Sequence, residues 1–141
     1  MIKFQTPRIA NEWNSGSLNP TLRTITIEAA RYAKMKYNWD FELNSIYRTP
    51  QEDAAAGARG NIHPAWRSVD VRTKLPDGKM QRPQSQIADV TRYINLNWMY
   101  DPSRPKMVVC YSETHGSGPH LHLQAHPNTK KMVYAKNRVP A

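Results

Sequence analysis

Two short segments of the chain carry side chains that could do chemistry together. The first runs from Asn61 to Asp70 and contains His63, and the second contains His120 and His122. Imidazole nitrogens and a carboxylate oxygen are donors that a borderline-soft divalent ion such as zinc accepts. Three protein ligands would leave a fourth position for water, which is typical of a catalytic rather than a structural zinc. The pattern therefore predicts a zinc site with an open position.

Strands are the elements expected to position these side chains. Alternate residues of a strand face the same side of a sheet, about 6.5–7 Å apart. In a strand over residues 120–125, His120 and His122 would point together while the intervening leucines point into the core. Asp70 would project from a strand over residues 66–73, and the loop before that strand would supply the first histidine. Ligands on strands are held firmly, as a metal geometry requires.

The rest of the chain predicts the scaffold. Residues 1–18 are expected to form an irregular lead-in. Periodicity and capping signals predict further elements: helices over residues 20–36, from Pro50 through Ala56, and from a cap at Ser85 to near Pro102, with strands over 41–47, 66–73, 106–111 and 120–125. This order indicates an α+β domain with a small, mostly antiparallel sheet and two main helices.

Size and composition favour one domain over residues 1–141, with residues 126–141 as a basic tail. The chain has 141 residues, of which 39% are hydrophobic, enough for a packed core. The single cysteine, Cys110, excludes an internal disulfide and is expected to be a buried, inert thiol. No run of about 18 apolar residues would span a membrane. The N-terminus lacks the pattern of a secretory signal, so we expect synthesis and retention in a cytoplasm.

The charge favours polyanionic partners without choosing among them. Twenty lysines and arginines against eleven acids give a net charge of +9, which suits nucleic acid, an anionic membrane or an acidic cell wall. The basic cluster Lys130, Lys131, Lys136 and Arg138 contains no acid and is interpreted as a solvated tail.

The two motifs also resemble those of a known family. The first reads Asn61-Ile62-His63-Pro64-Ala65-Trp66-Arg67-Ser68-Val69-Asp70, and the second His120-Leu121-His122. They resemble the signature S-x-H-x-x-G-x-A-x-D followed by H-x-H of zinc peptidases that include D-Ala-D-Ala carboxypeptidases and phage L-alanyl-D-glutamate endolysins, whose fold the hedgehog signalling domain shares. Asn61, Trp66 and Ser68 replace the family's Ser, Gly and Ala. The resemblance covers about residues 41–125 and includes the segment Ser45-Ile46-Tyr47-Arg48-Thr49.

This resemblance implies a fold of the hedgehog and D-Ala-D-Ala-peptidase type and a role for each matching residue. His63, Asp70 and His122 would bind zinc, and His120 would hydrogen-bond the developing oxyanion. Arg48 would steady the substrate or the same charge, although a plain alternative is a solvent-exposed arginine at a strand end. The zinc would lower the pKa of its bound water toward about 7 and polarise the scissile carbonyl.

The general base is the role that the sequence leaves open. Many members of the family have an acid three residues before the last zinc histidine, where this chain has Pro119. Glu113 is the nearest carboxylate, with an exposed loop glutamate as the alternative interpretation, and His115 is a second candidate. A base must come within hydrogen-bonding reach of the attacking water. If neither residue serves, zinc would be bound with little or no hydrolysis.

The resulting hypothesis is a zinc metallopeptidase, either a carboxypeptidase or an endopeptidase, that cleaves the stem peptides of bacterial peptidoglycan. A phage origin would fit the small size and the lack of an export signal, with release by lysis or packaging in a virion, and the basic surface would adhere to anionic wall polymers. One alternative is a metal-dependent DNA nickase of the His-hydrophobe-His type, for which only Tyr134 follows as a nucleophile. Another is a non-catalytic zinc-binding module, in which the metal contributes stability.

Overall fold

The computed structural model describes residues 1–57, 62–113 and 119–132, and the described part is built on one five-stranded sheet. The strand order is β1-β2-β3-β6-β5, in which β1 and β2 are parallel and the other pairs antiparallel. The strands of this sheet are β1 (Ile2–Phe4), β2 (Phe41–Ser45), β3 (Ser68–Arg72), β5 (Cys110–Glu113) and β6 (His120–Gln124). The expected α+β class with a mostly antiparallel sheet is confirmed.

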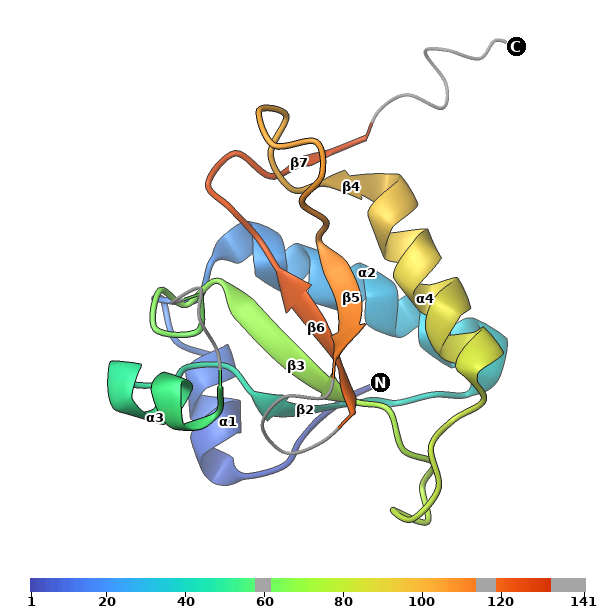
Figure 1. Cartoon of the computed structure of the whole chain (residues 1–141). Helices are drawn as coiled ribbons and strands as arrows, with labels where there is room; N and C mark the ends of the chain where they lie inside the picture. The colour runs from blue at the N-terminus through green and yellow to red at the C-terminus, as the bar shows by residue number, and fades with distance from the viewer. Residues whose placement is uncertain (58–61, 114–118, 133–141) are drawn as a thin grey trace, which may run out of the picture.

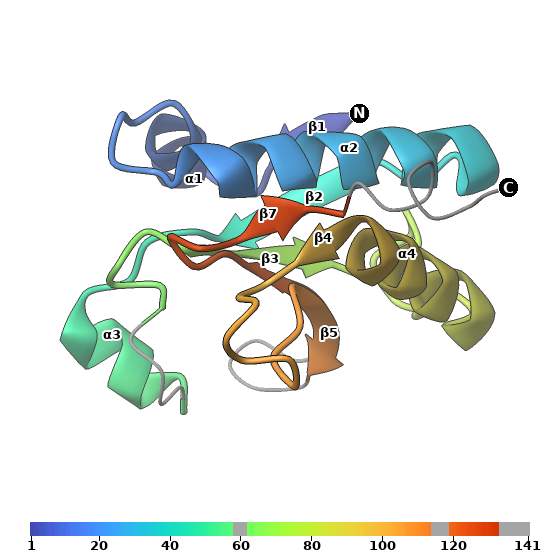
Figure 2. The same ribbon diagram turned by 90° about the horizontal axis from the view of Figure 1, so that it is seen from above.

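Four helices accompany the sheet in the described residues, two of them long, as predicted. They are α1 (Pro7–Trp13), α2 (Pro20–Tyr37), α3 (Pro50–Ala55) and α4 (Gln84–Asn97). Figure 1 shows α2 and α4 on one side of the sheet, and Figure 2 shows α2 running along that face while α3 lies near one edge. A second, two-stranded sheet pairs β4 (Trp98–Met99) with β7 (Lys130–Lys131).

The core lies between the sheet and α2. Strand residues that point into this core alternate with residues that point to the other face of the sheet. Val69 and Val71 of β3 and Leu121 and Leu123 of β6 are fully buried in one hydrophobic cluster with residues of α2 such as Leu22. Because side chains alternate along a strand, Asp70, His120 and His122 lie on the opposite face. The predicted alternation of the His-Leu-His segment is therefore confirmed.

Local signals that the sequence shows clearly set the helix boundaries. The Asn19 side chain accepts a hydrogen bond from the Leu22 amide at 3.0 Å, and Pro20 occupies the first helical position of α2. Thr49 and Glu52 form the predicted capping box at the start of α3. Helices α2 and α3 match their predicted ranges within a residue.

Three expectations for these elements were wrong. Residues 1–18 are not simply irregular, because β1 finds a parallel partner in β2 and Thr6 caps α1 by accepting from the Ile9 amide. Ser85 does not cap α4, which begins at Gln84 after Pro83 and has no side-chain cap. That helix ends at Asn97 rather than near Pro102, since β4 follows and pairs with β7.

The strand predicted over residues 106–111 was also misplaced, because β5 runs Cys110–Glu113. The Asn95 side chain from α4 bonds both the amide and the carbonyl of Cys110, at 2.9 and 2.8 Å, and so ties the start of the strand to the helix. Cys110 is buried, as predicted, and burial raises the pKa of its thiol to about 12. None of the helices in the described ranges combines the length and the apolarity needed to cross a bilayer.

Candidate metal centre

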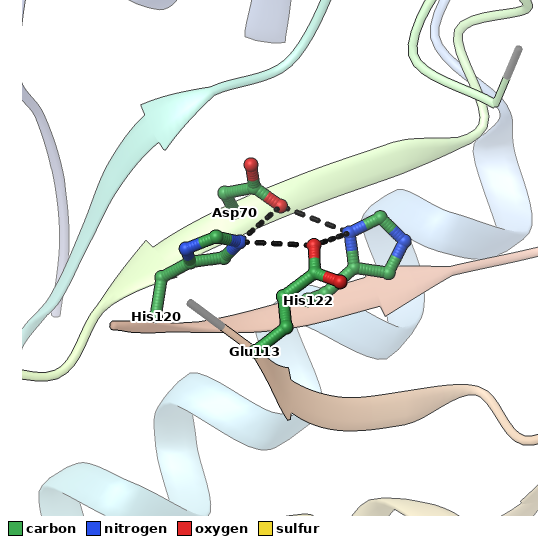
Figure 3. A group of neighbouring side chains, drawn as sticks. All are labelled: Asp70, Glu113, His120 and His122. Carbon is green, nitrogen blue, oxygen red and sulfur yellow. Dashed lines mark hydrogen bonds and ion pairs between the residues drawn. The ribbon is translucent and has the colours of Figure 1, made fainter. Parts of the chain in front are cut away.

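Strand pairing brings four potential metal ligands together on the face of the sheet opposite α2. In the β3–β6 pair Asp70 stands opposite His122, and in the β5–β6 pair Glu113 stands opposite His120. Each of the four residues offers one ligand atom, and these atoms all lie within 4.8 Å of one another (Figure 3). These four residues, Asp70, Glu113, His120 and His122, are called the metal cluster below. Its members fit a metal ion by donor type and by spacing.

The contacts within the metal cluster form a closed ring of four (Figure 3). His122 Nδ1 lies 3.0 Å from Asp70 Oδ1 and 3.7 Å from Glu113 Oε1. His120 Nε2 lies 3.2 Å from Glu113 Oε1 and 3.5 Å from Asp70 Oδ1. Asp70 and both histidines are buried, whereas the Glu113 side chain is 22% exposed. Glu113 therefore forms the part of the cluster that faces solvent.

His63 approaches the same carboxylate from the loop before β3. Its Nδ1 lies 2.7 Å from the carbonyl oxygen of Ile46, and since a carbonyl only accepts, Nδ1 must carry the proton. The lone pair is then on Nε2, which lies 3.4 Å from Asp70 Oδ2 and, among the described residues, is buried without a hydrogen-bond partner. A buried acceptor aimed at a carboxylate is costly unless a cation lies between them. The unpartnered Nε2 of His63 is therefore suited to bind a metal ion at this position.

The ionisation of the central pair reflects the same crowding of donors. Burial would raise the pKa of Asp70, but the hydrogen bond from His122 and the close approach of the His63 ring outweigh it and hold that pKa well below the ordinary range. Burial lowers the pKa of His122, yet the hydrogen bond and charge of Asp70 outweigh that effect and raise it above the usual value. The site thus keeps a negative carboxylate in a buried position, where it attracts cations.

Arg48 supplies one such cation. Its guanidinium donates to Asp70 Oδ2 at 3.0 Å and to Asp53 Oδ1 of α3 at 3.2 Å, and its side chain is 16% exposed. Arg48 is thus held between two buried acids at the edge of the cluster rather than projecting into solvent. The capping box of α3 positions Asp53, which in turn fixes this arginine.

Trp66, in the segment before β3, has an unusual backbone conformation. Its φ is +60°, in the left-handed region that favours glycine, at the position where the compared signature has Gly. The Trp66 amide donates to the His63 carbonyl at 3.0 Å, which closes the turn that carries His63. Its ring stacks on Tyr47 with centroids 4.6 Å apart. Stacking offsets the strain of a conformation that costs roughly 1–2 kcal/mol for a residue with a Cβ.

Gln124 is a functional candidate that the sequence reasoning missed. Its Nε2 donates to the Val108 carbonyl at 2.9 Å, which leaves Oε1 to accept from His122 Nε2 at 3.1 Å. Metal-binding histidines commonly donate their second N–H to such a partner. The signal was present, because Gln124 follows His122 by two residues and so shares its face of the strand.

The structure brings together most of the predicted site residues. Asp70 contacts His63, His122 and Arg48, so the three predicted zinc ligands meet at one carboxylate. His120 and Glu113 are close enough to be ligands themselves. Five residues considered for the site or the basic tail, Asn61, His115, Tyr134, Lys136 and Arg138, lie outside the described residues.

A cavity opens beside the metal cluster. It has a volume of about 300 Å³ and is lined by Glu113 and His120 together with uncharged side chains, among them Gln84 and Ile87 at the start of α4. Thr73, Gln81 and Ser112 complete its polar wall. The space is large enough for part of a small substrate, and it reaches the cluster on the side of Glu113.

Comparisons with known proteins do not indicate a family or a function for this chain. No family model, no curated protein and no solved structure matches the chain.

Proposed function

We propose that this protein is a zinc-dependent peptidase that cleaves the stem peptides of bacterial peptidoglycan, as a carboxypeptidase or an endopeptidase. The observation that carries the proposal is that His63 Nε2, from a loop, and His122 Nδ1, from strand β6, both lie against the buried carboxylate of Asp70 on strand β3. Two imidazoles and one carboxylate suit zinc and leave a position open. The left-handed conformation at Trp66, where related zinc peptidases have glycine, adds support for the resemblance.

The residues around this ligand set have the positions that peptide hydrolysis needs. Bound zinc would supply a Lewis acid and would lower the pKa of its water to about 7. Glu113, partly exposed and beside the cavity, is placed to take the proton of that water. His120 would donate a hydrogen bond to the developing oxyanion, and Arg48 would compensate charge at Asp70 or bind a substrate carboxylate. His115, which lies outside the described residues, stays a second candidate for the base.

A second function is favoured by a specific observation. Because Glu113 and His120 also belong to the metal cluster, its four residues could occupy all four coordination positions of a tetrahedral zinc site. A site closed in this way would be structural, and the protein would be a non-catalytic zinc-binding module. A nickase has no comparable support, since its nucleophile Tyr134 lies outside the described residues, although the charge of +9 suits nucleic acid.

Metal analysis of single variants distinguishes the two. In the peptidase, His63→Ala and His122→Ala lose zinc, whereas His120→Ala and Glu113→Gln keep one zinc per chain and lose turnover. In the closed site, His120→Ala loses zinc and His63→Ala keeps it. His126→Ala is the matched control, because His126 is a histidine outside the cluster whose Nδ1 accepts from the Asn128 amide.

Purified peptidoglycan is the substrate that tests the activity. Incubation with the zinc-loaded protein should release peptide fragments identified by mass, and the bond that is cut then defines the specificity. Fragments made equally by the protein and its His63→Ala variant would discredit the assignment. We further propose that the basic surface favours contact with anionic wall polymers and that the protein acts after release by lysis or from a virion; wall binding that does not weaken with added salt would count against the electrostatic contact.

A further inference from the structure

Arg82 is a buried cation that the metal centre does not use. The residue is 7% exposed, and its Cζ lies 4.8 Å from the centroid of the Trp39 ring. Its backbone amide donates to the Thr73 carbonyl at 2.9 Å, which fixes the chain just before α4. In the described part of the chain, however, its guanidinium has no ion pair, and its Nε is buried without a hydrogen-bond partner. A buried N–H without an acceptor is costly, so an anion that accepts from Arg82 Nε would stabilise this arrangement.

The guanidinium lines a cavity that carries positive charge. The cavity has a volume of about 150 Å³, and four cations, Lys3, Arg72, Lys74 and Arg82, line it together with two carboxylates, Asp40 and Glu42. These side chains leave a net charge of plus two, and none of them belongs to the metal cluster.

Both carboxylates are already engaged by other cations. Asp40 lies 3.0 Å from Lys34 and 3.4 Å from Lys3, and Glu42 lies 3.1 Å from Arg72. Within the described residues, Lys74 and Arg82 are the two lining cations that lack an ion pair. Burial lowers the pKa of Arg82, and the charge of Asp40 offsets only part of that effect, which agrees with an uncompensated charge.

We propose that this cavity binds a phosphate group, with Arg82 as a bidentate ligand and Lys74 as a second positive charge. A planar guanidinium fork matches two oxygens of a phosphate, and an ammonium adds a point charge. Two unpaired cations balance a phosphate dianion better than a carboxylate monoanion. The group can come from free phosphate, which is largely a dianion near neutral pH, or from a phosphodiester polymer, in which each phosphate carries one negative charge. The proposal is independent of the proposed peptidase function.

Titration of the purified full chain with inorganic phosphate at constant ionic strength, set with sodium chloride, tests the site. Binding is followed by calorimetry and by the NMR signal of the Arg82 Nε–H. Saturable one-to-one binding that shifts this signal is expected, with sulfate also binding and acetate at least tenfold weaker. A synthetic glycerol-phosphate oligomer that binds more tightly than inorganic phosphate would identify a polymer source, and weaker binding would identify the free ion.

Variants locate the binding. Arg82→Lys keeps the charge but loses the fork, and Lys74→Gln removes the second charge, so each should weaken phosphate binding at least tenfold. Lys79→Gln, an exposed lysine of the same loop that does not line the cavity, should bind like the original protein. His122→Ala should also bind phosphate normally, which separates this site from the metal centre and its failure from a failure of the peptidase proposal.

The opposite results overturn the proposal. Phosphate that binds no better than chloride, or acetate that binds as tightly as phosphate, would exclude a phosphate site. Phosphate binding that survives both Arg82→Lys and Lys74→Gln would place the anion elsewhere. Arg82→Met removes charge and fork together and should abolish binding; if that variant does not fold, the two milder variants decide the question.

Discussion

At the scale of single residues, the ability of the candidate site to bind a metal depends on which nitrogen of each histidine carries the proton. The Ile46 carbonyl fixes the proton of His63 on Nδ1, and the Val108 carbonyl orients Gln124 so that its Oε1 accepts from His122 Nε2. Each contact directs the other ring nitrogen toward Asp70. His122 Nδ1 must still lose its proton to bind a metal, since only the neutral ring is a ligand.

Replacing Gln124 tests this orientation. Gln124→Met has a similar shape but cannot accept from His122, so we expect zinc affinity to fall by about 10–100-fold. Gln124→Glu keeps an acceptor for His122 while losing the donor to Val108, so it should retain zinc binding and lose some stability. Zinc affinity is measured by competition with a chelator, and the tautomer of His122 by NMR. If affinity followed stability in both variants, Gln124 would have only a structural role.

Trp66 allows a matched test of backbone strain. Trp66→Gly and Trp66→Ala both lose the stack on Tyr47, but only alanine keeps a Cβ in the left-handed conformation. We expect the alanine variant to be less stable than the glycine variant by about 1 kcal/mol. Urea unfolding of the two variants measures the difference. Equal stabilities would show that the turn relaxes when the indole is removed.

At the scale of elements, the sequence predicted the strands that carry the ligands better than the pairing that completes the site. The alternation in His120-Leu121-His122 and the spacing from His63 to Asp70 are local patterns, and both led to the correct face of the sheet. Glu113 was expected in a loop, but it is the last residue of β5. Its place beside His120 follows from the register of β5 on β6, which no local pattern encodes.

Long-range pairing also explains the other errors. Strand β1 has three residues and gains its order from β2, while β4 and β7 have two residues each and define one another. Such short strands carry too little periodicity to be predicted singly. Gln124 escaped notice for a related reason, because its role depends on the Val108 carbonyl of a neighbouring segment.

Asp40 forms ion pairs with residues of helix α2 and strand β1, so the contact between these two elements should be sensitive to acid. The ion pair with Lys34 of α2 is the main cause that lowers the pKa of Asp40 to about 2, and Lys3 of β1 lies 3.4 Å away. An acid whose folded pKa is lowered stabilises the fold fully above its unfolded pKa of about 4 and loses that contribution as the pH falls toward 2. We expect Asp40→Asn to unfold with a shallower pH dependence between pH 4 and 2. Its free energy of unfolding, followed by urea titration at several pH values, should lie about 1 kcal/mol below the original at pH 6; parallel pH curves would contradict the prediction.

At the scale of the whole molecule, the residues of the candidate metal site come from the loop of His63 and from strands β3, β5 and β6. A metal ion bound by them should therefore stabilise the fold as a unit. Zinc that binds only the folded protein adds about 2.7 kcal/mol at a free concentration a hundredfold above its Kd. We expect zinc to raise the Tm of the chelator-treated protein and excess chelator to reverse the rise.

His122→Ala should abolish the shift and His126→Ala should preserve it, since His126 lies outside the cluster. Scanning calorimetry of the three proteins, with and without zinc, measures the effect. A shift that His126→Ala removes and His122→Ala leaves intact would place the bound zinc away from Asp70, and the peptidase proposal would then lose its physical basis.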